Sequence, residues 1–293
     1  MPTNGATRRG LLRELARQIV PAIHDLGSEP STADRPADLG RPAGPPTRTA
    51  SLDELTALAD TLGLRARRAD IARLAAGTGR LTPTPEASPA SWSVTDAEAV
   101  LHIDLAQMSS ALGGMPSPLP ARGTLRVTIV APLAGPAPVS LTCVARHAEA
   151  APEPSPSSAS RLALTGELVL PRAWSAAVEA LDLSEDERNA WIKLRRALAA
   201  AQGTVLPDED PDGAAVHRVL GYADERTGLL PEACDGRRPP TDADRTVPAA
   251  ERWRLLMQLS SGGGIVWPWG DERSRLYVWL HRGELDSAVA LLQ

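Results

Sequence analysis

The hydrophobic pattern changes its period along the chain, and this change constrains the fold more than any other feature. Between residues 100 and 170, several stretches alternate apolar with polar residues, as half-buried strands do. From 172 to 201 the apolar residues recur at helical spacing, and strand patterns then return. The clearest predicted strands are residues 100–106, 125–131, 139–146, 161–170, 253–260 and 275–281. A short Gly-rich segment joins the last two, so we expect 253–260 and 275–281 to pair antiparallel. Strands, then helices, then strands again indicate an α+β fold, with antiparallel sheet units and a pair of central helices at 172–182 and 185–201.

The N-terminal part has helical spacing without strand patterns. Its predicted helices are residues 8–24, 51–62 and about 68–76. Ser51 and Glu54 have the spacing of a capping box, which marks a helix start, and Ser184 and Glu187 have the same spacing at the start of the predicted helix at 185–201. Proline-rich stretches separate these helices and follow them. We therefore expect residues 1–89 to be a helical extension with proline-rich linkers, and residues 90–293 to form the main α+β domain.

Charge and hydropathy exclude several classes of protein. The 31 Lys and Arg residues oppose 36 Asp and Glu residues, giving a net charge of −5. General nucleic-acid and anionic-membrane binders need a basic surface, so neither partner is expected. No apolar run reaches the roughly 18 residues of a membrane helix. Arg13, Glu14 and Arg17 interrupt the apolar stretch that a signal peptide would need, so we expect a cytoplasmic protein.

Residue usage adds two expectations. The chain has seven Trp but no Phe, and Lys193 is its only lysine. The scarcity of residues with A/T-rich codons indicates a genome rich in G and C, although this does not explain the complete absence of Phe. Trp and Leu must therefore provide the bulk that Phe gives to most cores. Cys143 and Cys234 form no CxxC motif; one disulfide is possible, but free thiols in a reducing cytosol are expected.

Two short motifs favour plain interpretations. Residues 208–213 match the start of a calcium-binding EF-hand loop, but the twelfth position is Val219 and Pro211 interrupts the loop. The helices at 51–76 carry several arginines, as a DNA-binding helix-turn-helix does, but the first helix is acidic. We expect an acidic turn and a packed helical extension, with no metal and no cofactor.

The candidate binding site lies near the C-terminus, at Trp267, Trp269, Asp271, Arg273 and His281. Two Trp residues of the same parity point to one face of an extended chain, and the Pro between them places the segment at an edge or turn. Such an aromatic shelf with polar neighbours suits a peptide or a small molecule. Alternatively both rings fill the core; we expect the first Trp to be partly exposed and the second to be buried.

The last part of the chain also carries a family resemblance. Its motifs are Glu-Arg-Trp-Arg-Leu-Leu-Met-Gln-Leu-Ser-Ser at 251–261, Trp-Pro-Trp-Gly-Asp at 267–271, Leu-Tyr-Val-Trp-Leu at 276–280 and Gly-Glu-Leu-Asp at 283–286. These residues resemble the end of the YwqG-like family, a bacterial domain family with no established activity. Weaker similarity extends back to about residue 90, through His-Arg-Val-Leu-Gly-Tyr at 217–222. The resemblance implies an α+β fold with internally repeated sheet units.

Two functions remain open from the sequence. The first is a noncatalytic interaction or accessory protein that binds a protein or peptide partner through a Trp-bearing sheet face. The second is an enzyme or an accessory protein of specialised metabolism, with a small-molecule pocket near Trp267, Asp271 and His281. A deep pocket with a buried ionisable group would favour the second, and a flat apolar patch the first.

Overall fold

The structure is a computed structural model. It describes residues 49–84, 90–95, 98–113, 115, 117–131, 141–149, 159–204, 206, 216–224, 230–261, 265 and 274–292. The chain divides into two compact units, 1–38 and 39–293, and every described residue lies in the second. Among the described residues, no helix is long and apolar enough to span a membrane.

Strands and helices both contribute to the second unit. The strands are β1 (Ala76–Thr84), β2 (Ala90–Val94), β3 (Glu98–Asp104), β4 (Thr124–Val130), β5 (Thr142–Ala148), β6 (Ser160–Val169), β7 (His217–Val219), β8 (Trp253–Ser260), β9 (Arg275–His281) and β10 (Ala288–Leu292). The α-helices are α2 (Leu52–Thr61), α3 (Arg68–Leu74), α4 (Leu105–Ala111), α5 (Ala176–Glu179), α6 (Glu185–Ala201), α7 (Leu230–Arg237) and α8 (Ala249–Arg252). The α+β prediction is confirmed at this level.

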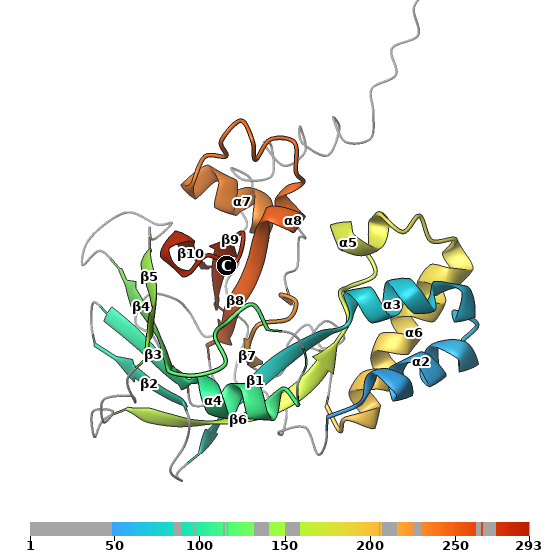
Figure 1. Ribbon diagram of the computed structural model, residues 1–293, viewed down its shortest axis with the longest axis horizontal. Coiled ribbons are helices and arrows are strands. Elements are labelled where there is room, and N and C mark those ends of the chain that lie inside the picture. The colour runs from blue at the N-terminus through green and yellow to red at the C-terminus, as the bar shows by residue number, and fades with distance from the viewer. Residues whose placement is uncertain are drawn as a thin grey trace, which may run out of the picture. The chain divides into compact units, whose positions relative to one another are not determined.

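These strands form one antiparallel sheet in the order β10-β9-β8-β7-β1-β6-β2-β3-β4-β5. The predicted pairing of 253–260 with 275–281 is confirmed, because β8 and β9 pair antiparallel from Trp253–His281 to Ser260–Arg275. The edge strands β10 and β5 lie close to each other, so the sheet curves almost into a barrel (Figure 1). Apolar residues from both halves of the sheet fill its interior, together with Met108 of α4 and Leu112 directly after this helix.

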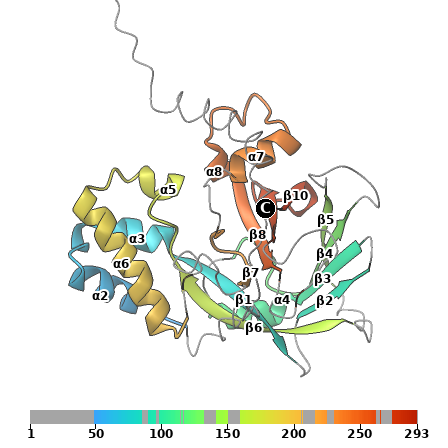
Figure 2. The ribbon, with the colours of Figure 1, turned by 180° about the vertical axis from the view of Figure 1, so that it is seen from behind.

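The pair of helices expected at the centre of the fold lies elsewhere. Helices α5 and α6 pack with α2 and α3 beside one end of β1 and β6 (Figures 1 and 2). Trp191 and Leu194 of α6 are buried against Leu55 of α2 and against Leu168 and Leu170 at the end of β6. The helices are peripheral because the inner face of the curved sheet already buries its own side chains.

The division expected between residues 89 and 90 also differs from the structure. β1 lies inside the stretch expected to be an extension, yet it pairs with β6 over nine residues and with β7 on its other side. The start of α2 is fastened to the same sheet by Gln202, which is only 1% exposed. Its Oε1 accepts hydrogen bonds from the amides of Ala50 and Leu168, at 3.1 and 2.8 Å. Residues 49–84 therefore belong to the same unit as the remaining strands.

Both predicted helix starts are confirmed in their details. Ser184 caps α6: its hydroxyl accepts from the Glu187 amide at 3.2 Å, and the Glu187 carboxylate accepts from the Ser184 amide at 2.9 Å. Ser51 and Glu54 repeat this arrangement at α2. Arg67 adds a second contact at α6, because its Nε donates to Glu187 Oε1 at 2.7 Å. One carboxylate thus joins a helix cap to the neighbouring helix pair.

Helices α2, α3, α5 and α6 pack together, and we call them the helical layer. The contacts of Glu187 predict that this layer loses stability in acid. Hydrogen bonds lower the pKa of Glu187 from 4.5 to about 2. The largest contribution comes from Arg67, and smaller ones come from Ser184. A carboxyl group whose folded pKa is depressed contributes stability above its unfolded pKa and loses it as the pH falls to the folded value. We expect melting temperatures measured between pH 4.5 and 2 to fall less steeply in Glu187→Gln than in the wild type. The control is Glu185→Gln, on the same helical turn; an unchanged slope in Glu187→Gln would contradict the prediction.

Candidate functional site

Most of the site predicted near the C-terminus lies outside the described residues. This holds for Trp267, Trp269, Asp271 and Arg273, and also for the acidic loop at 208–212. His281 is among the described residues and ends β9, where it is 8% exposed. Its ring packs edge-on against the ring of Trp253, with 5.1 Å between the two ring centroids.

His281 belongs to a packed polar network. Its Nε2 lies 3.3 Å from Oδ1 of Asp244, which also accepts a hydrogen bond from Arg282 at 2.6 Å. Hydrogen bonds from Thr241, and then from Arg282, hold the pKa of Asp244 well below its usual range. Nearby, Asp235 pairs with Arg252 and accepts from the Trp253 indole. This network fastens the segment of α7 and α8 to β8 and β9, so the structure gives His281 a structural role.

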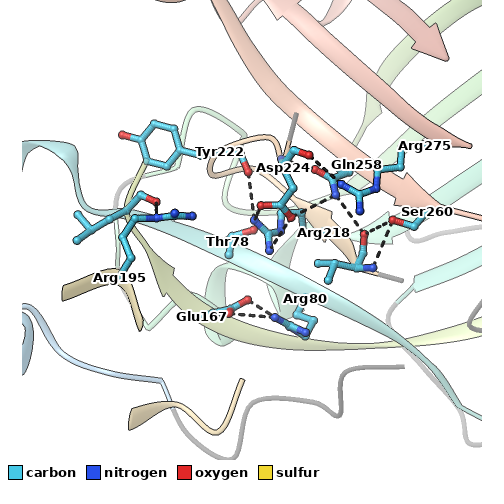
Figure 3. Close-up of polar contacts among 12 residues, drawn as sticks. Thr78, Arg80, Glu167, Arg195, Arg218, Tyr222, Asp224, Gln258, Ser260 and Arg275 are labelled. Atoms are coloured by element: carbon cyan, nitrogen blue, oxygen red, sulfur yellow. Dashed lines mark hydrogen bonds and ion pairs between the residues drawn. The ribbon is translucent and has the colours of Figure 1, made fainter. Parts of the chain in front are cut away.

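A second polar cluster surrounds a cleft between β6, α6 and the residues after β7 (Figure 3). Arg218 and Asp224 are both almost fully buried and form a two-point contact, with Nη2–Oδ2 at 3.2 Å and Nη1–Oδ1 at 3.3 Å. Gln258 pairs with Asp224 from β8, accepting from its amide at 2.8 Å and donating to its carboxylate at 3.3 Å. Arg275 donates to the Asp224 carbonyl at 2.8 Å. These contacts tie the turn after β7 to β8 and β9.

Arg80 and Glu167 form a buried ion pair at the floor of this cluster (Figure 3). Two hydrogen bonds join them, Nε–Oε2 at 3.2 Å and Nη2–Oε1 at 3.1 Å, across neighbouring strands β1 and β6. Burial disfavours the carboxylate, but the charges of Arg80 and Arg218 outweigh it and lower the pKa of Glu167. The pair is therefore ionised at neutral pH.

The cleft carries more positive than negative charge. Arg172, Arg195 and Arg218 line it together with Glu167 and Asp224. The Nε of Arg218 is buried without a hydrogen-bond partner in the described structure. The residues of this cleft come from segments that are distant in sequence, so no local pattern predicts it.

A third feature is the outward side of β2, β3, β4 and β5, which we call the outer face. Along β4 the inward residues Val127 and Ile129 are fully buried, while the outward Arg126 and Val130 are exposed. Val130 is 41% exposed and Val144 of β5 is 40% exposed. Among the described residues, no α-helix packs on this side of these strands (Figures 1 and 2). The outer face is thus the convex side of the curved sheet, with apolar and basic side chains exposed on it.

One row of the outer face is basic. Strand pairing aligns its members directly, from β6 through β2, β3 and β4 to β5: Arg161, Ser91, His102, Arg126 and Arg146. We call these residues the arginine row. Its three arginines are exposed, and none of them makes a hydrogen bond or ion pair within the described part of the chain. The next row, Val100, Thr128 and Val144, places apolar groups beside this charge.

The remaining chemistry of the described residues is limited. No group of His, Cys, Asp and Glu side chains within them could hold a metal ion. Both cysteines are free thiols, as predicted. Burial raises the pKa of Cys143 to about 12, which keeps this thiol protonated and weakly nucleophilic at neutral pH.

No protein-family model matches the chain. No curated protein matches it either. The resemblance to the YwqG-like family therefore stays a prediction.

Proposed function

We propose that this protein is a noncatalytic binding protein that engages a protein or peptide partner through the outer face of its sheet. The observation that carries the proposal is the outer face itself, where exposed valines and unpaired arginines stand on strands with buried inward residues such as Val127 and Ile129. Exposed apolar groups on a rigid surface, rimmed by polar residues, are typical of protein-interaction sites. The cleft holds the buried ionisable groups Glu167 and Asp224, a feature that favours the enzyme alternative, but each of them is paired with an arginine. We also propose a cytoplasmic location and membership of the YwqG-like family.

The proposal is tested by photo-crosslinking at the outer face. A photoreactive phenylalanine analogue at Val144 should crosslink one partner protein in cells, while the same group at the exposed Trp174 of the helical layer should not. The partner's identity is then checked by reciprocal purification and by the loss of the crosslink in Val130→Glu. Equal products from positions 144 and 174, or none from 144, would contradict the proposal.

A second candidate function is the binding of a small anion in the cleft. The specific observation is the unpartnered Nε of the buried Arg218, beside the positive charge of the cleft walls. Inorganic phosphate should then raise the melting temperature of the wild type, and Arg218→Met should remove this increase. The small-molecule pocket expected from the sequence would lie beside Trp267, Asp271 and His281. Only His281 is among the described residues, and its side chain packs against Asp244.

A further inference from the structure

We propose that the partner presents an acidic, extended peptide segment that crosses the strands along the arginine row. This inference rests on the proposed function, because it names the chemistry that the outer face recognises. The row crosses five neighbouring strands. At about 4.8 Å between strands it spans roughly 19 Å, the length of about six residues of an extended peptide.

The alignment of like charges is the first argument for an anionic partner. Arg126 of β4 and Arg146 of β5 are directly paired, which brings their Cβ atoms to about 5 Å of each other. Like charges in such a pair are destabilising when nothing compensates them. Carboxylates from a partner would supply this compensation, and the planar guanidinium groups favour two-point contacts with them.

The pairing of other arginines is the second argument. In the described structure, Arg67, Arg80, Arg218 and Arg282 each contact a carboxylate of this chain. The arginines of the row have no such contact, although the chain as a whole is acidic. Arg65 and Arg238 also lack a carboxylate contact within the described residues. The row differs from them because strand pairing aligns its positive charges on one surface, where they can select an acidic partner and speed its association.

The neighbouring row distinguishes a peptide from a nucleic acid. Val100, Thr128 and Val144 offer aliphatic contact beside the charges, whereas single-stranded nucleic acids are bound by aromatic side chains that stack on the bases. The described outer residues of β3, β4 and β5 include no Trp or Tyr. A peptide with glutamates and interspersed apolar residues matches both rows.

The test uses fluorescence anisotropy with the full chain. The probe is a fluorescein-labelled peptide of about twelve residues, in which Glu alternates with Ala and Leu, and the matched probe has Gln in place of Glu. We expect the Glu peptide to bind at least about tenfold more tightly, and its Kd to rise with added NaCl. The double variant Arg126→Glu/Arg146→Glu should lose this binding. Its control, Arg65→Glu/Arg238→Glu, changes the net charge equally at exposed arginines outside the row and should retain the binding.

Three results would overturn the inference. They are equal affinity for the Glu and Gln peptides, equal loss of binding in both double variants, and tighter binding of a labelled oligothymidylate than of the Glu peptide. Circular dichroism melts verify that each variant is folded, which we expect because the substituted side chains are exposed. If Val144 crosslinks a partner but the Glu peptide does not bind, the inference of an acidic partner is wrong and the proposed function stands. If the crosslink also fails, both are wrong.

Discussion

Replacing Gly166 with alanine should destabilise the protein by more than about 3 kcal/mol and leave it largely unfolded. A Cβ atom built at this position of β6 would lie only 1.8 Å from the carbonyl oxygen of Ala111, at the end of α4. The obstacle is backbone, so it cannot rotate away as a side chain can. The Gly166 carbonyl is also held in place by the hydroxyl of Thr49, at 2.7 Å. Urea denaturation followed by Trp fluorescence measures the effect.

Gly236→Ala is the matched control for this substitution. Gly236 lies in α7, and a Cβ atom there meets nothing within 4 Å. Because alanine favours the helix over glycine, this variant should be as stable as the wild type or more stable by up to about 1 kcal/mol. Near-native stability of Gly166→Ala would show that α4 does not lie against β6 as closely as the structure places it.

Removing one partner of the buried Arg80–Glu167 pair should cost about 3–5 kcal/mol. Arg80→Met leaves the Glu167 carboxylate without its two hydrogen bonds to Arg80, in an interior where a charge is poorly solvated. In this variant Arg218 and Thr204 remain near the carboxylate, so the lower end of this range is expected. Thermal and urea unfolding both measure the loss.

The double variant Arg80→Met/Glu167→Leu separates the cost of an unpaired charge from the value of the pair. When both charges are replaced by apolar groups of similar size, much of the stability should return. The double variant should therefore be more stable than Arg80→Met alone. If it is less stable, the loss reflects altered packing between β1 and β6 and not an uncompensated carboxylate.

The elements that could be predicted from the sequence are those with strong local signals. The alternation at 253–260 and 275–281 predicted β8 and β9, and their short connection predicted antiparallel pairing. The capping boxes at Ser51 and Ser184 predicted the starts of α2 and α6. In each case the residues that define the element lie within a few positions of one another, so no tertiary information is required.

The elements that escaped prediction depend on tertiary contacts. β1 contains Gly77, Gly79 and Pro83, which weaken a strand pattern. The glycines are explained only by the fold, because a Cβ atom at Gly77 or Gly79 would collide with Met115 or Leu164. Helix α4 follows β3 directly, and its local signal was Asp104, whose carboxylate caps the helix by accepting from two amides.

The candidate site shows the same limit. Alternation placed Arg126 opposite the apolar residues of β4, but it could not align Arg126 with Arg146 and Arg161, because alignment depends on strand register. The sequence places His281 at the end of a predicted strand, where it is either structural or part of a site, and only the fold shows that Asp244 and Trp253 enclose it. The cleft around Asp224 likewise depends on Arg218, Gln258 and Arg275, which come from three strands.

The central position of β1 also determines the order in which the chain can fold. During synthesis, β1 leaves the ribosome long before either of its partners, because β6 ends at Val169 and β7 begins at His217. The hydrogen bond between Ala50 and Gln202 spans a still longer interval of synthesis, because these residues lie 152 positions apart in the sequence. Such long-range pairing makes folding slow. It leaves a partly apolar strand without β6 until residue 169 has been added, and with one edge unpaired until residue 219 has been added. The period of greatest risk of aggregation therefore falls during translation, before β7 closes the sheet around β1.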